Sequence, residues 1–152
     1  DFTDLLHTLK KRRPGPLAHH AALAGLPHSW TPVRSFRESY YVNCFNPYPV
    51  WISDSLFVRQ TMDGPRPSRI SAAERIAPTH YRLRTTAGDA GIDRVDIYLV
   101  DTVCRMAVFA FSNDRKTERF QSLYVPFETG LEMDMIVPLR ETDPKTDKTN
   151  NE

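Results

Sequence analysis

Glycine is scarce in this 152-residue chain: there are six, and none opens a GxxxxGK or GxGxxG motif. Such loops let backbone N–H groups approach phosphates closely, so the sequence disfavours a nucleotide-hydrolysing enzyme built on one. Long apolar runs are lacking as well. The longest extends from Met106 to Phe111, far short of the ~20 residues that a membrane-spanning helix needs. We therefore expect no transmembrane segment.

Cysteine is also rare, with only Cys44 and Cys104, sixty residues apart and each within an apolar, strand-like run. Free cysteine often packs as a small hydrophobe, so we expect two reduced core thiols, with a single disulfide as the alternative. The cysteines and the five histidines do not form CxxC or HExxH spacings. Since neighbouring ligands at one metal need such spacings, we predict no metal site and no cofactor. A reactive cysteine needs an electropositive, partly exposed setting, whereas both cysteines lie in apolar runs, so we assign no catalytic residues and favour a non-enzymatic protein over an enzyme.

Acidic residues are absent between Leu5 and Arg37, whereas residues 38–152 carry fourteen lysines or arginines against seventeen acids. The charge is therefore sorted by segment, and the amino-terminal part is cationic. An arginine-rich, acid-poor beginning is typical of organelle-targeting regions, so we expect an intracellular protein, mitochondrial in one interpretation. The interaction residues predicted on this basic arm are Lys10, Lys11, Arg12, Arg13, Arg34 and Arg37.

The hydrophobic period changes along the chain and divides it into three parts. Apolar residues at helical spacing predict two short helices, one before Pro14 and one over residues 17–26, within a basic helical arm at 1–37. From residue 38 onward the period is two, which predicts an antiparallel β-rich domain over 38–139. Residues 140–152 form a polar tail without hydrophobic anchors.

Two segments of the β-rich part alternate clearly, at residues 80–86 and 94–100. An antiparallel pair would place Asp96 beside Arg82 or Arg84, which is favourable for opposite charges. We assign Asp96, like Asp101, Glu132 and Asp134, to solvated faces. Residues 103–111 are apolar on both faces, which indicates a central strand, and 131–139 read as the last strand.

A short helix is predicted where Ser71 precedes Glu74 by three residues, because this spacing forms a capping box. Together these signals predict an α+β fold. Six or seven antiparallel strands would form a curled sheet or small sandwich with one short helix over it, preceded by the basic helical arm.

Three functions remain open. The leading hypothesis is a non-enzymatic accessory or structural subunit of a larger multiprotein assembly, whose partners are other protein subunits. The alternative is a nucleic-acid-contacting module, such as a ribosomal accessory protein, in which the basic residues bind phosphates and Tyr40 and Tyr41 stack on bases. The third is a small ligand-binding or enzymatic domain with its pocket inside the sheet.

Overall fold

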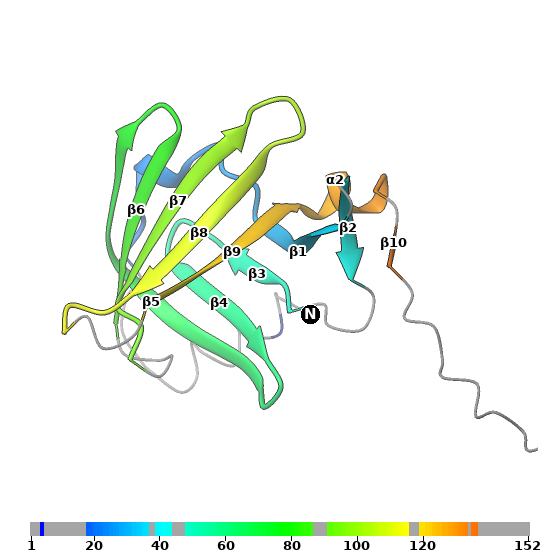
Figure 1. Cartoon of the computed structure of the whole chain (residues 1–152). Coiled ribbons are helices and arrows are strands. Elements are labelled where there is room, and N and C mark those ends of the chain that lie inside the picture. Colours follow the sequence, from blue (N-terminus) through cyan, green and yellow to red (C-terminus); the bar gives the residue numbers. More distant parts are fainter. Residues whose placement is uncertain are drawn as a thin grey trace, which may run out of the picture.

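The computed structural model describes Asp4 and residues 18–36, 39–43, 48–86, 91–115, 119–133 and 135–136. Within these residues, eight antiparallel strands close into a barrel, because the last pairs back with the first (Figure 1). Each barrel strand pairs with the barrel strand that follows it in the chain. Around the barrel the order is β1 (Ser29–Phe36), β3 (Val50–Ile52), β4 (Leu56–Thr61), β5 (Gly64–Ala77), β6 (His80–Thr85), β7 (Arg94–Asp101), β8 (Met106–Ser112) and β9 (Arg119–Pro126).

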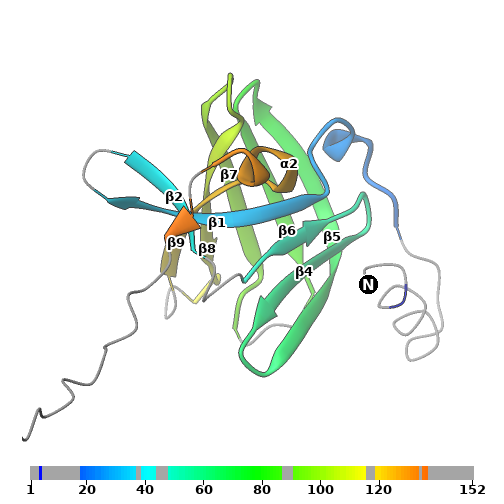
Figure 2. The ribbon, with the colours of Figure 1, turned by 90° about the vertical axis from the view of Figure 1, so that its right-hand side faces the viewer.

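Besides its pairing with β3, strand β1 pairs with two further strands along its length. Its first part pairs with β9, from Trp30 opposite Pro126 to Pro32 opposite Tyr124, and its second part pairs with β2 (Ser39–Asn43). The β1–β2 hairpin therefore projects from the barrel wall, as Figure 2 shows. The helix α2 (Phe127–Leu131) follows β9, and β10 (Met135–Ile136) adds a short parallel pairing to β2.

The barrel interior is filled by side chains. Along β7 and β8, alternate residues such as Val95, Ile97, Phe109 and Phe111 point inward and are buried. Trp30 is fully buried, meets Phe109 edge to face with 5.1 Å between ring centroids, and donates from Nε1 to the Pro27 carbonyl at 2.7 Å. An eight-stranded barrel is just wide enough for such filling, so this packing accounts for the core.

A smaller apolar cluster lies on the outer side of the wall. Val33, Met106 and Val125 are buried there, and partly buried residues of β2, β9 and the neighbouring turns pack against them. One of these is Cys104, whose thiol is free. It lies in the turn before β8 rather than in a strand, while Cys44 is outside the described residues.

The expected α+β fold is wrong. The protein is mostly sheet, and the sheet closes instead of remaining a curled sheet or sandwich of six or seven strands. Asp4 is helical, and residues 18–36 of the expected helical arm contain a single 3-10 turn, η1 (Ala21–Leu23), followed by β1. Gly25 has φ 87° and Pro27 follows, while Leu23 and Leu26 are buried against the core, so packing replaces helix propagation. Apart from Asp4, the first expected helix lies outside the described residues.

Two further elements differ from the sequence-based expectation. Ser71 and Glu74 lie inside β5, not at a helix start, because this long strand pairs with both β4 and β6. Such tertiary pairing overrides a local capping signal. Within 131–139, the described residues hold the end of α2 and the short β10. None of the described helices is long and apolar enough to cross a membrane.

Candidate functional site

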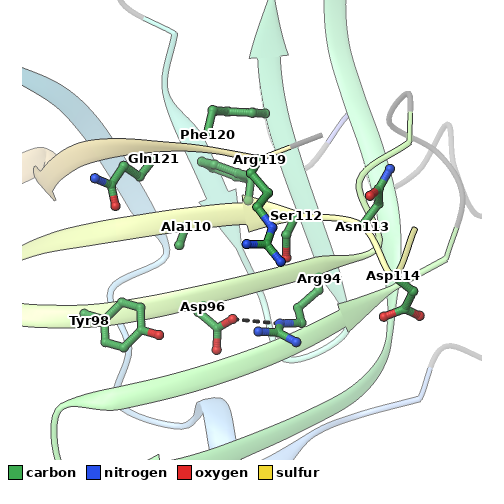
Figure 3. Close-up of a pocket in the computed structure, with 11 residues that line it drawn as sticks. Arg94, Asp96, Tyr98, Ala110, Ser112, Asn113, Asp114, Arg119, Phe120 and Gln121 are labelled. Carbon is green, nitrogen blue, oxygen red and sulfur yellow. Dashed lines mark hydrogen bonds and ion pairs between the residues drawn. The ribbon is translucent and has the colours of Figure 1, made fainter. Parts of the chain in front are cut away.

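A groove of about 530 Å³ runs along β8 on the outer face of the barrel (Figure 3). Strand β8 forms the floor of the groove, where the outward residues Ala110 and Ser112 have small side chains. The neighbouring strands β7 and β9 carry longer outward side chains, which form the walls. The strand registers align these residues in rows across the three strands. The walls consist of Arg94, Asp96 and Tyr98 from β7 and Arg119 and Gln121 from β9.

One of these rows places a serine between two arginines, with one arginine on each side. Arg94 pairs with Ser112 across β7 and β8, and Ser112 pairs with Arg119 across β8 and β9. Figure 3 shows the Arg119 guanidinium beside the Ser112 side chain, and the Arg94 guanidinium beside Asp96. Two cationic side chains and a hydroxyl thus line the same end of the groove, an arrangement that suits a carboxylate or phosphate.

Asp96 anchors the neighbouring row and is only 2% exposed. Its Oδ2 accepts a hydrogen bond from Arg94 Nε at 2.9 Å, and its Oδ1 accepts from Arg82 Nε at 2.9 Å and from His80 Nε2 at 2.7 Å. Burial raises the pKa of this carboxyl, but the hydrogen bonds from His80, Arg82 and Arg94 outweigh burial, and the net pKa lies below the ordinary value. Asp96 is therefore ionised at neutral pH.

The ionised carboxylate of Asp96 determines which ring nitrogen of His80 carries a proton toward it. Because a carboxylate can only accept, His80 must carry its proton on Nε2 to make the 2.7 Å contact with Asp96. The His80 ring also stacks on Tyr98, with centroids 4.2 Å apart and planes inclined by 21°. The Asp96 network therefore orients Tyr98 as well as Arg94.

The other acid of the groove is also bound by an arginine. Asp114 Oδ1 accepts from Arg84 Nη1 at 2.6 Å, and this hydrogen bond raises the pKa of Arg84 although desolvation opposes it. Arg84 stands directly opposite Arg94, a like-charge pair that is unfavourable unless each side has its own counterion. The two aspartates supply those counterions.

Positive charge remains at the serine end of the groove after these pairings. The groove residues and their ion-pair partners comprise four arginines, at 82, 84, 94 and 119, and two aspartates, at 96 and 114. These residues carry two more positive than negative charges. Asp93, whose Oδ2 accepts a hydrogen bond from the Asp114 N–H, reduces this excess of positive charge to one. Arg119 is exposed and has no ion-pair partner among the described residues, so it is available to an anion.

A second hollow, of about 380 Å³, lies where β1 leaves β9 for β2. Tyr124 and Ser122 line it from β9, with Pro32 and Arg34 from β1. Burial raises the pKa of Tyr124, although the charge of Arg59 and a hydrogen bond to Ser122 oppose this. This hollow has no row of converging cations comparable to that of the β8 groove.

The predicted interaction and stacking residues that the structure describes, Arg34, Tyr40 and Tyr41, do not line the groove. Lys10–Arg13 and Arg37 lie outside the described residues. Arg34 on β1 is exposed and lies directly opposite Tyr41 on β2, whereas Tyr40 lies opposite Ser35. Since side chains alternate along a strand, Tyr40 and Tyr41 point to opposite faces of the hairpin.

The predicted proximity of Asp96 and Arg82 is confirmed, but the assignment of Asp96 to a solvated face is wrong. The carboxylate does point outward, yet three long side chains cover it. Asp101 and Glu132 are exposed as expected, and Asp134 lies outside the described residues. Alternation in the sequence indicated the β6–β7 half of this site, whereas Arg119 joins it only through the β8–β9 register.

In the described part of the chain, no group of three histidine, cysteine or acidic side chains is placed to hold a metal ion. No protein-family model matches the chain, and comparisons with curated proteins and with solved structures give no significant match.

Proposed function

We propose that the protein acts by binding rather than by catalysis, as an accessory module that recognises an anionic group in the groove over β8. The observation that carries this proposal is the row of Arg94, Ser112 and Arg119 beside the buried carboxylate of Asp96. A carboxylate or phosphate seated over Ser112 would lie between two guanidinium groups. Arginine binds both anions in a planar, bidentate manner.

Preorganisation of Arg94 favours binding. Its Nε is held by Asp96 at 2.9 Å, while its terminal N–H groups have no other described protein partner. An arginine already fixed in this way loses less side-chain entropy when it binds a ligand than a free one does. Arg119 on the opposite wall is exposed and supplies the second fork.

The acid–base pair next to the groove has a structural explanation. His80 and Asp96 contact each other as they would in a catalytic site, yet no hydroxyl or thiol of the described residues hydrogen-bonds to either of them. A nucleophile activated by a base would need such a contact. The pair instead orients Arg94 and Tyr98, which favours binding over covalent catalysis.

The proposal is tested by calorimetric titration with inorganic phosphate and with acetate at low salt. Arg119→Gln removes one of the two forks and should weaken phosphate binding about tenfold, the lower range for a hydrogen bond to a charged group. Arg105→Gln is the matched control, since it makes the same charge change on an exposed arginine at the far end of β8. Absence of binding by the native protein, or equal weakening in both variants, would contradict the proposal.

The second candidate is the subunit of a multiprotein assembly. It is favoured by the projecting β1–β2 hairpin and by the exposed apolar side chains of α2, Phe127 at 50% and Leu131 at 70%. The test is native purification of the full chain, followed by the same purification of a Phe127→Ser, Leu131→Ser variant. Loss of a stoichiometric partner from the variant supports this candidate, and an isolated monomer in both preparations rejects it.

The nucleic-acid alternative also stays a prediction. Arg34 and Tyr41 share one face of the hairpin, so they are the described residues that would contact a strand together. Binding of a single-stranded oligonucleotide should then weaken by about 0.7 log unit per log unit of salt for each phosphate contacted. Affinity that does not depend on salt would exclude it.

A further inference from the structure

We infer that the groove takes an aromatic anion of nucleotide size, in which a planar ring lies about 10 Å from a phosphate, an estimate based on strand spacing. The inference rests on the proposed function, because it assigns the phosphate to the basic end already described. It adds a second contact at the other end of the groove, where Tyr98 forms part of the wall. A nucleoside 5′-monophosphate has both groups, separated by a ribose.

The two ends of the groove are separated by a fixed length of strand. Arg94 and Tyr98 both point outward from β7 and are four residues apart, which corresponds to about 13 Å between their Cα atoms. Arg94 leans toward Tyr98 because its Nε is bound to Asp96. The distance that a ligand must span is therefore nearer to 10 Å, which exceeds a simple phenyl phosphate and suits a nucleotide.

Tyr98 offers one ring face to the groove. Its neighbours across the strands are His80 on β6 and Val108 on β8. The His80 ring occupies the face on the β6 side at 4.2 Å, so the opposite face is turned toward β8, where the groove lies. The side chain is 40% exposed. This is the face on which a ligand ring would stack.

The stacking surface is held rigidly. His80 is itself fixed by its 2.7 Å bond to Asp96, so the ring behind Tyr98 cannot move away when a ligand ring presses against the other side. The same carboxylate holds Arg94 at the basic end. One buried group thus sets the distance between the two recognition elements, and we class Asp96 as a positioning residue.

The middle of the groove suits a polar linker such as a ribose. Ala110 forms the floor, and Gln121 stands across it from Asp96. A glutamine amide both donates and accepts hydrogen bonds, so Gln121 can bind hydroxyl groups. The volume of about 530 Å³ lies within the range of small-ligand sites, and a nucleotide-sized ligand is compatible with it.

The test compares adenosine 5′-monophosphate, ribose 5-phosphate and adenosine by calorimetry on the full chain. We expect the nucleotide to bind about five- to 150-fold more tightly than ribose 5-phosphate, from the usual contribution of one stacked base. Tyr98→Leu should remove this advantage and leave ribose 5-phosphate unchanged, while Tyr98→Phe should retain it. Tyr40→Leu, a change at another exposed tyrosine, is the matched control.

The outcomes separate this inference from the proposed function. Equal affinities for nucleotide and ribose 5-phosphate would overturn the ring contact while leaving the anion site intact. If neither phosphate binds, both proposals fail. If adenosine binds as tightly as the nucleotide, the arginines at the basic end do not bind the phosphate. If the nucleotide still binds more tightly than ribose 5-phosphate in Tyr98→Leu, the ligand ring does not stack on Tyr98.

Discussion

Replacing Asp96 by asparagine tests the network on which the groove depends. The change keeps the shape of the side chain but removes a charge that is 2% exposed and accepts three hydrogen bonds. The asparagine amide also places an NH₂ donor opposite one of the N–H donors that Asp96 binds. Breaking a buried ion pair costs about 3–5 kcal/mol. Arg82 and Arg94 are 30% and 35% exposed, so water can solvate them partly, and we expect a loss of about 2–3 kcal/mol.

For a chain of this size, each kcal/mol lowers Tm by about 2–4 °C, so the variant should melt about 4–12 °C below the native protein at pH 7. The pH dependence of this difference in Tm shows whether it comes from the charge of Asp96. The pKa of Asp96 is lowered on folding, so its stabilising effect is complete above the unfolded pKa and is lost as the pH falls through the folded pKa. The difference in Tm should therefore stay constant from about pH 7 to 5 and narrow below about pH 4.

The assay is thermal unfolding followed by far-ultraviolet circular dichroism at several pH values, with Asp114→Asn as the control. Asp114 also binds an arginine, yet its side chain is 68% exposed, so its replacement should change Tm little. The reasoning is refuted if Asp96→Asn changes stability by less than about 0.5 kcal/mol at pH 7, the ordinary size of a surface substitution. It is also refuted if the difference widens on acidification.

Three further changes probe the groove, the core and a turn. Ala110→Leu should fill the floor of the groove and abolish phosphate binding without altering charge, whereas Ala72→Leu, at an exposed strand alanine, should leave binding unchanged; retained affinity in Ala110→Leu would place the anion elsewhere. Trp30→Ala should cost about 3–5 kcal/mol in urea unfolding, because it removes a fully buried ring that packs on Phe109, and a loss below about 1 kcal/mol would contradict the assigned core. Arg105→Gly should raise the unfolding free energy by up to about 1 kcal/mol, since the residue has φ 59°, and a decrease would argue against that turn conformation.

Local alternation predicted part of the sheet correctly. The strands at residues 80–85 and 94–101, and the contact of Arg82 with Asp96, followed from charges and apolar residues at period two. Closure of the barrel did not, because it depends on the pairing of Trp30–Pro32 with Tyr124–Pro126, segments far apart in the chain. No local signal indicates such a contact.

The site was predicted only in part for the same reason. The sequence showed which face Asp96 occupies but not that His80, Arg82 and Arg94 would cover it. Burial of a carboxylate on an outward face depends on the lengths of its cross-strand neighbours and on their register. The small floor between β7 and β9 likewise emerges only when Ala110 and Ser112 are placed beside their paired residues.

The most direct test of the central claim is a nuclear magnetic resonance titration of the isotope-labelled protein with adenosine 5′-monophosphate. The backbone amides of Asp96, Ala110, Ser112 and Gln121 should shift progressively and saturate together, since they lie under or beside the ligand. Resonances of the distant hairpin, such as Tyr40, should stay in place. If the groove amides do not move, or if the shifts gather around Arg34 and Tyr48 at the second hollow, the anion does not bind over β8.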